Sequence, residues 1–339
     1  MLLTDAGNIL VIQLAGLGDM VLALPALTGL RESFPNARIS VLSNSRAKEV
    51  IRGLGWVDEL FVCDNYGDFL FKISALRKKN FDMVINLYRI YSWAGAVKMF
   101  FVFSCIGGKY WVGRDTDSRG FFYNIKVKED LPDDIHEVEH KLACIRAVAP
   151  DLKDVKPDLR VLPQDQRALE LVLESEGIKP GDLLVGINCA TFDPSRNWPS
   201  SCYARLAEIL SFELKAKVAF SAAEKDRAFL KNIKRSTNAP IVDLCGKLTV
   251  GELIAFIKKC DVYVTPDSGP MHIAAFLGVP LLALFGEGEY SELRPFGRDD
   301  KIIVIRKPVK LITPSEAAGS VRELLEHGKK DKDTSSSYA

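Results

Sequence analysis

The sequence predicts an α/β protein of two domains, each built on a parallel β-sheet with helices on its faces. At 339 residues, the chain is too long for a single comfortable hydrophobic core. In each half, apolar strands alternate with helical segments, and such crossover connections produce parallel sheets. Between the halves, segment 150–163 is rich in Pro, Asp and Lys, as expected of a linker. The carboxyl ends of both sets of strands can then face a ligand in a cleft between the domains.

The first half opens with a strand at 8–14, a glycine turn at 15–19 and a helix at about 20–34. Pro35-Asn36 ends that helix, and a second strand follows at 37–42. These elements form a βαβ unit, whose crossover makes its two strands parallel. Further strands are expected at 59–63, 83–87 and 110–112, and further helices near 46–53, 68–79, 92–105 and 135–148.

The same alternation restarts after the linker with a charged helix at 164–176. Apolar runs of strand length, separated by helical segments, then repeat to about residue 285. The tail from Gly328 passes through Lys, Asp and Ser in succession, a composition that predicts disorder. Strands are expected at 183–188, 217–221, 241–244, 261–265 and 281–285, and helices at 199–214, 224–236 and 250–259.

Composition excludes several broad classes of protein. A formal net charge of +1 gives no overall attraction to nucleic acid or to a strongly anionic membrane. Seven cysteines are scattered without a C-x-x-C pair, which indicates reduced thiols rather than a disulfide framework or a zinc cluster. We find no signal-peptide pattern, and the strongest apolar run, 99–106, is far shorter than the roughly 20 residues of a membrane span. We therefore expect a cytoplasmic protein that at most touches a membrane surface.

The segment D-S-G-P-M-H, from Asp267 to His272, has the pattern of a helix N-terminus directly after a buried strand. Asp267 or Ser268 can cap this helix, and Gly269 lets a ligand approach the backbone. Pro270 suits the first turn, where its missing N–H leaves no bond unmade. The free N–H groups and the positive end of the helix dipole then favour a phosphate or pyrophosphate. An ordinary capped turn is the alternative that this segment alone leaves open.

The turn Gly16-Leu-Gly-Asp19 follows a strand and opens a helix, as a dinucleotide-binding fingerprint does. Val21 stands where that fingerprint has its third glycine, and the second strand ends in Ser43-Asn44 without an acidic residue for a ribose. A redox cofactor is therefore not expected. Asp19 either complements the helix dipole or acts as a general base that faces the cleft and takes a proton from an acceptor hydroxyl.

Four segments follow one another in a characteristic order. They are I-L-V-I-Q-L-A-G-L-G-D with L-P-A-L and F-P-N-A near the start, R-N-W-P at 196–199, A-A-E at 222–224, and D-S-G-P-M-H-I-A-A-F-L-G-V-P-L-L-A-L-F-G at 267–286. Together they resemble glycosyltransferase family 9, the inverting transferases that include the ADP-heptose:lipopolysaccharide heptosyltransferases. The resemblance extends from Asn8 to about Leu325.

This resemblance implies the α/β fold called GT-B, in which two Rossmann-like domains with parallel sheets face each other across a cleft. Residues 1–163 would bind the acceptor, 164–327 would bind the sugar nucleotide, and 328–339 would form a disordered tail. The implied reaction moves a heptose or related sugar from an ADP-activated donor to a lipopolysaccharide core or another surface glycan. The configuration at the anomeric carbon would invert, and no metal ion or other cofactor would take part.

Within the family pattern, Asp19 matches the catalytic base, in the glycine loop that contains Gly16 and Gly18. The leaving nucleotide diphosphate would rest against the helix that begins at Ser268. Backbone N–H groups and Arg196 would there replace the metal ion that other transferases use.

Other matched positions imply contacts with the nucleotide sugar. Thr191 would contact phosphate through its hydroxyl and amide, Glu224 would hold the ribose hydroxyls, and His272 would lie beside the phosphates. Each has an ordinary alternative: a loop residue, a helix N-terminal acid and a hydrogen-bonded histidine. The full set implied for the sugar nucleotide is Thr191, Arg196, Glu224, Asp267, Ser268, Gly269 and His272.

The chain departs from the family pattern at two places. The family usually has Lys where this chain has Arg196, which keeps the charge and changes the geometry of phosphate contact. Many members have Pro-Gly-Ala where this chain has Asn188-Cys-Ala190, so the first phosphate loop is less rich in glycine. The donor can therefore bind in a slightly different position from that in other family members, or it can be a different sugar nucleotide.

The implied partners are the sugar nucleotide and a lipid-linked or anionic glycan, without nucleic acid. A cytoplasmic location follows, with room for peripheral contact with the cytoplasmic face of the inner membrane. Two alternatives stay open: a GT-B transferase or epimerase acting on another sugar nucleotide, and a non-catalytic nucleotide-sugar-binding protein.

His136-Glu-Val-Glu-His140 fits H-E-x-x-H, in which two histidines one helical turn apart bind zinc and the glutamate acts as base. No third ligand follows in a fitting context, and the equivalent helix of the family often begins with a similar H-E-V. We therefore expect no zinc site and assign the motif to the exposed polar face of a helix.

Segment 88–111 interleaves aromatic residues with cations. Most of these aromatic residues are expected in the core of the first domain. Arg89, Lys98, Arg114 and Arg119 nevertheless lie in the acceptor half, and an anionic, lipid-linked glycan would need such cations and a lightly apolar surface.

Overall fold

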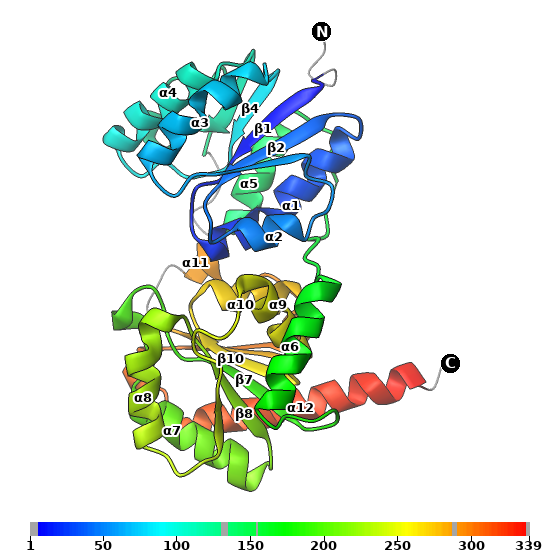
Figure 1. Cartoon of the computed structure of the whole chain (residues 1–339), viewed down its shortest axis with the longest axis vertical. Coiled ribbons are helices and arrows are strands. Elements are labelled where there is room, and N and C mark those ends of the chain that lie inside the picture. Colours follow the sequence, from blue (N-terminus) through cyan, green and yellow to red (C-terminus); the bar gives the residue numbers. More distant parts are fainter. Residues whose placement is uncertain (1–5, 130–134, 154, 287–289, 337–339) are drawn as a thin grey trace. The chain divides into compact units, whose positions relative to one another are not determined.

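The computed structural model describes residues 6–129, 135–153, 155–286 and 290–336, with side chains as far as residue 328. The chain divides into two compact units (Figure 1). The first comprises Met1–Arg160 with Ser291–Leu293, and the second comprises Val161–Tyr290 with Arg294–Ala339. This division falls inside the predicted linker, three residues before the expected boundary at 163.

The first unit contains a six-stranded parallel sheet in the order β3-β2-β1-β4-β5-β6. Helices α1 and α5 pack together, and α3 and α4 pack together, as the two helical layers of this unit. The strands are β1 (Asn8–Ile12), β2 (Arg38–Ser43), β3 (Glu59–Val62), β4 (Met83–Asn86), β5 (Tyr110–Arg114) and β6 (Ile125–Val127). The helices are α1 (Leu17–Ser33), α2 (Lys48–Arg52), α3 (Tyr66–Lys78), α4 (Trp93–Ile106) and α5 (Glu137–Arg146).

The second unit contains another six-stranded parallel sheet, in the order β12-β11-β10-β7-β8-β9. Helix α7 packs against α8 and α12, while α9 packs against α6 and α10. The strands are β7 (Leu184–Asn188), β8 (Lys217–Ser221), β9 (Ile241–Asp243), β10 (Val262–Pro266), β11 (Leu281–Phe285) and β12 (Ile302–Arg306). The helices are α6 (Pro163–Ser175), α7 (Ser200–Glu208), α8 (Arg227–Arg235), α9 (Val250–Lys259), α10 (Gly269–Phe276), α11 (Tyr290–Leu293) and α12 (Pro314–Ser336).

Both sheets have the same topology, because the second order is the first one written backwards with each strand number raised by six. In each sheet the first three strands are added in order from the centre to one edge. The chain then returns to the centre, and the last three strands are added toward the opposite edge. The reversal falls between β1 and β4 in the first unit and between β7 and β10 in the second. Ligands of doubly wound sheets bind beyond the carboxyl ends of the two strands at such a reversal.

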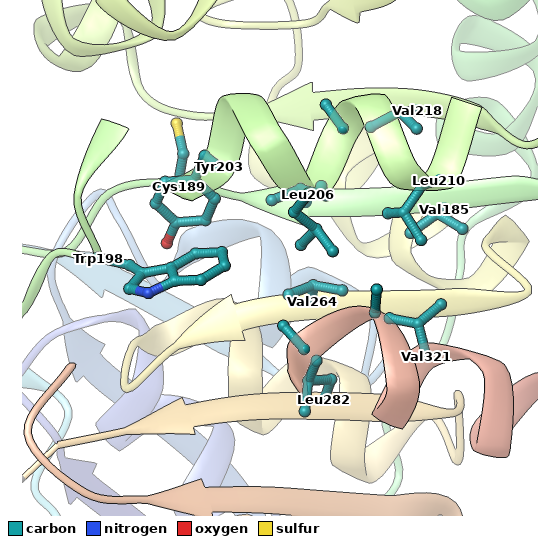
Figure 2. Close-up of a cluster of buried hydrophobic side chains, with 14 of the residues drawn as sticks. Val185, Cys189, Trp198, Tyr203, Leu206, Leu210, Val218, Val264, Leu282 and Val321 are labelled. Carbon is teal, nitrogen blue, oxygen red and sulfur yellow. The ribbon is translucent and has the colours of Figure 1, made fainter. Parts of the chain in front are cut away.

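The core of the second unit is organised around Trp198, which is fully buried at the start of α7 (Figure 2). Its indole Nε1 donates a hydrogen bond of 3.0 Å to the carbonyl of Ile312, and its ring meets that of Tyr203 edge-on at 5.0 Å. Figure 2 shows Val264 and Leu282 from the central strands and Leu206 from α7 filling the space beside these rings. The buried R-N-W-P tryptophan therefore joins α7 to the segment that precedes α12.

Four elements differ from the sequence predictions. The edge strands β6 and β12 are not anticipated, because the short, partly exposed Ile125–Val127 and Ile302–Arg306 lack the fully buried run of the central strands. The predicted helix at 199–214 ends as α7 at Glu208 and continues as one π-helical turn, Ile209–Glu213. Helix α12 extends to Ser336, so the expectation of disorder from Gly328 is wrong as far as Ser336, and 337–339 lie outside the described residues.

Within the described residues, no helix combines the length and the apolar character that a membrane span requires.

Replacing Trp198 with Ala tests the assignment of this residue as the centre of the second core. We expect the free energy of unfolding of the second unit to fall by about 3–5 kcal/mol, because removing a large buried side chain leaves a cavity behind. The measurement is urea denaturation followed by far-ultraviolet circular dichroism. The matched control is Leu171→Ala, on the exposed side of α6, for which a surface substitution changes stability by about 0.5 kcal/mol or less. Equal stability of the two variants would contradict the assignment.

Candidate active site

In the second unit, the candidate site residues lie at the carboxyl ends of β7 and β10. These strands pair in parallel, with Val185, Gly186 and Ile187 opposite Val262, Tyr263 and Val264. Their carboxyl ends therefore meet at one edge of the sheet, where Asn188 ends β7 and the D-S-G-P segment follows β10. The predicted helix N-terminus directly after a buried strand is confirmed, since β10 ends at Pro266 and α10 begins at Gly269. Gly278 follows this helix with φ +65°.

Asn188 ties the two strand ends together. Its Nδ2 lies 3.2 Å from Thr265 Oγ1 and 3.0 Å from Ser268 Oγ, and it also donates to the carbonyl of Ala190 at 3.0 Å. The hydroxyls of Thr265 and Ser268 are hydrogen-bonded to each other at 2.9 Å. Asn188 therefore fixes the position of the helix start.

Ser268 is the N-cap of α10 by backbone position, with extended φ of −162° and ψ of 167°, but its side chain makes no capping hydrogen bond. The prediction that Asp267 or Ser268 caps this helix through its side chain is therefore wrong. The Ser268 hydroxyl is directed to Asn188 and Thr265 instead. The first-turn N–H groups at Gly269 and beyond are thus not covered by a side-chain cap, an arrangement that suits an anion.

Asp267 binds Arg196 beside the helix start. Arg196 Nη1 lies 2.8 Å from Asp267 Oδ2, across 71 residues of sequence. Burial raises the pKa of Asp267, and the neighbouring Arg196 opposes that rise. The guanidinium is itself about half exposed and is available to a ligand. The surrounding cavity has a volume of about 360 Å³ and is lined by Ser195, Arg196, Asp267, Leu284, Gly286, Pro308, Val309 and Lys310.

Thr191 lies in the loop that leads to Arg196. Its backbone N–H donates to Asn197 Oδ1 at 2.8 Å, and its hydroxyl donates to the carbonyl of Asp193 and lies 3.0 Å from Asn197 Oδ1. In this structure both groups implied for phosphate contact are used within the loop 191–197. The loop is therefore held in one shape, and its polar groups are close to the Asp267–Arg196 pair.

Glu224 follows β8, the neighbour of β7, at the same edge of the sheet. Arg227 holds its carboxylate through two hydrogen bonds of 2.6 and 2.5 Å, which lower the pKa of the exposed Glu224. A Cβ atom at Gly246 would stand 2.0 Å from Glu224 Oε2, and Gly246 has φ +69°. The positive φ favours glycine, and a side chain at this position would displace the Glu224 carboxylate. The sequence analysis missed Arg227 and Gly246, although the i,i+3 spacing of Glu224 and Arg227 on a helix could have indicated their pairing.

His272 lies in the first turn of α10 and is buried, with 5% of its surface exposed. Together with Ser268, Asp267 and Arg196 it belongs to the group of residues around the helix start. Glu224 is at the same sheet edge, one strand further out. Lys310 also lines the cavity and adds a second cation to it. The sequence around Lys310 gives no sign that it lies near Arg196, so it was not predicted.

Asp19, in the first unit, lies in the first turn of α1 directly beyond β1. Gly16 is the N-cap of this helix, with φ −67°, and Gly18 lies within its first turn. Gln13 Nε2 donates to the Asp19 carbonyl at 3.0 Å, and Asn44 Nδ2 donates to the carbonyls of residues 14 and 15. Asn44, the residue after the second strand, thus supports the glycine loop.

Burial raises the pKa of Asp19, Lys141 opposes this rise, and Glu137 adds to it. Lys141 is almost fully buried, and its Nζ lies 2.8 Å from Glu137 Oε1 and donates to the Leu87 carbonyl at 3.1 Å. Arg114 Nη1 lies 2.9 Å from both oxygens of Glu137. Asp19 is therefore a partly buried carboxylate beside an ion-paired cluster.

The H-E-x-x-H motif forms part of this cluster, and its assignment to an exposed polar face is wrong. Glu137 and His140 are buried with 5% and 8% of their surfaces exposed. Glu137 binds Arg114 and Lys141, and His136 caps α5 by accepting the Val138 N–H at its Nδ1. The motif does lie at the start of a helix, α5, as predicted. Its Glu137 faces inward, because Arg114 of β5 is buried and pairs with it.

A model of glycosyltransferase family 9 (heptosyltransferase) matches residues 72–312, more than half of the chain. The chain belongs to glycosyltransferase family 9. It is therefore a glycosyltransferase of the heptosyltransferase family, and its two parallel-sheet units form the GT-B fold.

Relatives of this family 9 chain cover nearly its whole length. It is 29% identical over 315 residues to lipooligosaccharide heptosyltransferase 2 of Haemophilus influenzae, covering 88% of each chain. The crystal structure of a family 9 glycosyltransferase from Veillonella parvula matches with a TM-score of 0.83 at 20% identity, covering 96% of this chain and 99% of that one. The ADP-heptose lipopolysaccharide heptosyltransferase II of Escherichia coli matches with a TM-score of 0.78 at 22% identity, covering 95% and 99%.

Glu137→Gln tests the buried cluster. Burial raises the pKa of Glu137, but the ion pairs with Lys141 and Arg114 outweigh burial and lower the pKa to about 2, from an ordinary 4.5. Its stabilisation is therefore present above pH 4.5 and lost as the pH falls toward 2. At pH 7 we expect the free energy of unfolding of the variant to be about 3–5 kcal/mol lower than that of the wild type, since two buried cations lose their shared anion. The loss should become smaller when urea denaturation is repeated at pH 3.

The matched control is Glu139→Gln on the same helix. Glu139 forms a half-exposed pair with Arg146 at 2.8 Å, and such a surface pair contributes about 1 kcal/mol or less. A pH-independent loss in Glu137→Gln, or an equal loss in the control, would contradict the role assigned to the cluster.

Proposed function

We propose that this family 9 glycosyltransferase transfers heptose from an ADP-activated donor to a lipopolysaccharide core or related surface glycan, with inversion and without a metal ion. The observation that carries this proposal is the arrangement at the carboxyl ends of β7 and β10. There an uncapped helix start, the Arg196–Asp267 pair and the buried His272 lie together. A diphosphate needs N–H donors and a cation, and this edge of the sheet provides both.

Asp19 is the proposed general base. It takes the proton of an acceptor hydroxyl while that oxygen forms a bond to the anomeric carbon. The bond from that carbon to the diphosphate oxygen breaks, and its electron pair leaves with the nucleotide. Because attack and departure occur on opposite sides, the configuration inverts. The burial that raises the pKa of Asp19 makes it a stronger base than an exposed aspartate, while Lys141 favours the ionised form that can accept the proton.

The negative charge that develops on the leaving diphosphate is stabilised in the second unit. First-turn N–H groups of α10 and the Arg196 guanidinium are fixed in advance, since Asn188 holds Ser268 and Asp267 holds Arg196. Preorganised donors of this kind lower the barrier because they need no rearrangement as charge develops. Thr191 is assigned to phosphate contact after its loop adjusts, and Glu224 to the ribose hydroxyls.

The other assignments follow from the same proposal. The first unit binds the acceptor and the second binds the nucleotide sugar, with no cofactor besides this donor. ADP-heptose as donor and lipopolysaccharide as acceptor are supported by membership of family 9 and by the relatives, which are lipooligosaccharide and ADP-heptose lipopolysaccharide heptosyltransferases. The proposed location is the cytoplasm, with peripheral contact to the membrane that holds the acceptor. A transferase or epimerase acting on another sugar nucleotide, and a binding protein without turnover, are the alternatives that the following experiments separate.

Asp19→Asn tests the proposed base. We expect acceptor-dependent ADP release to fall by about 10²–10⁴-fold, while ADP binding measured by calorimetry stays unchanged. In the wild-type protein, kcat should fall as the pH drops through a pKa above the usual range of an aspartate. Glu32→Gln, an exposed carboxylate in the last turn of the same helix, is the matched control and should retain full turnover. Undiminished turnover in Asp19→Asn would refute the mechanism, and an altered free sugar nucleotide without acceptor would indicate an epimerase.

Arg196→Ala tests the diphosphate site. A thermal-shift screen of ADP, UDP and GDP should show stabilisation by ADP, because a ligand that binds only the folded protein stabilises it by mass action. Loss of a charge-assisted contact of about 1.5–3 kcal/mol should weaken ADP binding roughly 10- to 100-fold in Arg196→Ala. Arg205→Ala, an exposed arginine of α7, is the control. Stabilisation by UDP or GDP but not ADP would overturn the heptose donor, and unchanged affinity in Arg196→Ala would overturn the location of the site.

A further inference from the structure

Helices α3 and α4 present an apolar surface where a globular protein ordinarily presents charges. Along α4, the exposed residues Trp93, Val97 and Phe101 recur at intervals of four, and Tyr66 and Leu70 do so along α3. Residues spaced by four lie on one face of a helix. These five side chains, with Phe121, are between 42% and 59% exposed, and we name the six together the aromatic face.

The aromatic face is continuous. The Tyr66 and Phe101 rings lie 6.2 Å apart and join α3 to α4. The rings of Trp93 and Phe121 stack at 6.4 Å and extend the surface beyond the start of α4. Phe100 contacts Phe121 at 5.8 Å and fills the space next to Phe101. Contiguous exposed apolar surface of this kind marks an interaction site, whereas single exposed apolar residues do not.

The charges that accompany the aromatic face are cationic. Segment 66–111 contains seven Lys and Arg residues against two Asp, in a chain whose formal net charge is only +1. Lys98 is the one charged residue of α4, and Arg77 and Lys78 are exposed at the end of α3. The one carboxylate on these helices, Asp68, is half-buried and accepts the Asp64 N–H at 2.9 Å.

A groove lies where the two helices end. It has a volume of about 530 Å³ and is lined by Ile73, Ser74, Arg77, Lys78, Asn80 and Cys105. Two exposed cations at its rim and apolar atoms on its walls suit a lipid headgroup with the upper part of its chains. An interfacial surface combines aromatic rings with Lys and Arg in this way, since the rings enter the headgroup region and the cations attract anionic lipid.

We propose that the aromatic face, with Arg77, Lys78 and Lys98, docks on a bilayer that contains anionic lipid. The charge of the face favours such a bilayer over a second copy of the chain, because two copies would bring their cations together. This inference rests on the proposed function in one respect, the lipid-linked acceptor, and membrane docking would keep the acceptor-binding unit next to that substrate.

The test is sedimentation of the full-length protein with vesicles that contain neither acceptor nor sugar nucleotide. We expect binding to phosphatidylcholine vesicles that include phosphatidylglycerol, with little binding to phosphatidylcholine alone. Trp93→Ser with Val97→Ser should weaken the partition constant about tenfold or more through lost apolar burial. Lys78→Glu with Lys98→Glu should do the same, because each cation near an anionic surface contributes about 1 kcal/mol. Brominated lipid should quench the fluorescence of Trp93, and Trp93→Phe should abolish that quenching while binding persists.

The matched control is Leu171→Ser with Lys231→Glu, which removes an equally exposed apolar residue and a cation from α6 and α8 of the other unit. This control should bind vesicles as the wild type does. The docking proposal is overturned if the wild-type protein stays in the supernatant, if it binds only when acceptor glycolipid is present, or if Trp93→Ser with Val97→Ser converts a wild-type dimer to monomers. Turnover on a delipidated acceptor reports on the proposed reaction separately, and it should be normal in the docking variants.

Discussion

The parallel pairing of β7 with β10 is the contact on which the candidate site of the second unit depends. Strands 77 residues apart in sequence become neighbours, so that Asn188 Nδ2 reaches Thr265 and Ser268. That short network takes the Ser268 hydroxyl away from its usual capping role and sets the orientation of α10. Since the topology reverses between these two strands, the same pairing also opens the space into which the helix start points.

The first unit repeats this architecture and uses it for a different purpose. Its own reversal lies between β1 and β4, and Asp19 lies in the first turn of α1, the helix that follows β1. Here the sheet edge holds a carboxylate whose burial opposes its ionisation, and the charges of Arg114, Glu137 and Lys141 lie close by. A buried, ion-paired cluster is expensive to assemble, because each charge loses its hydration. The proposed proton chemistry gives a reason for keeping such charges around one aspartate.

The outer helices of the two units differ in character. The exposed residues of α8 are mainly charged, as is usual for a helix at a protein surface, whereas α4 exposes aromatic residues and a single lysine. Both helices cover a parallel sheet, so the sheet does not require this difference. The apolar outer surface of α4 adds nothing to the folded core, and a role outside the chain accounts for it.

The sequence by itself determined the fold class, the division near residue 160, the helix start after β10 and the place of Asp19. These features depend on local patterns: apolar runs of strand length, glycine and proline at turns, and residues at fixed positions beside them. Only the tertiary structure decided that Ser268 does not cap α10 through its side chain, that Arg196 pairs with Asp267, and that the H-E-x-x-H helix is buried. It also decided that Trp93, Phe100 and Phe101 of α4 are exposed while Phe103 lies in the core. Periodicity reports that one face of a helix differs from another. Which face is buried, and which distant charge neutralises it, depends on neighbouring elements that the local sequence does not contain.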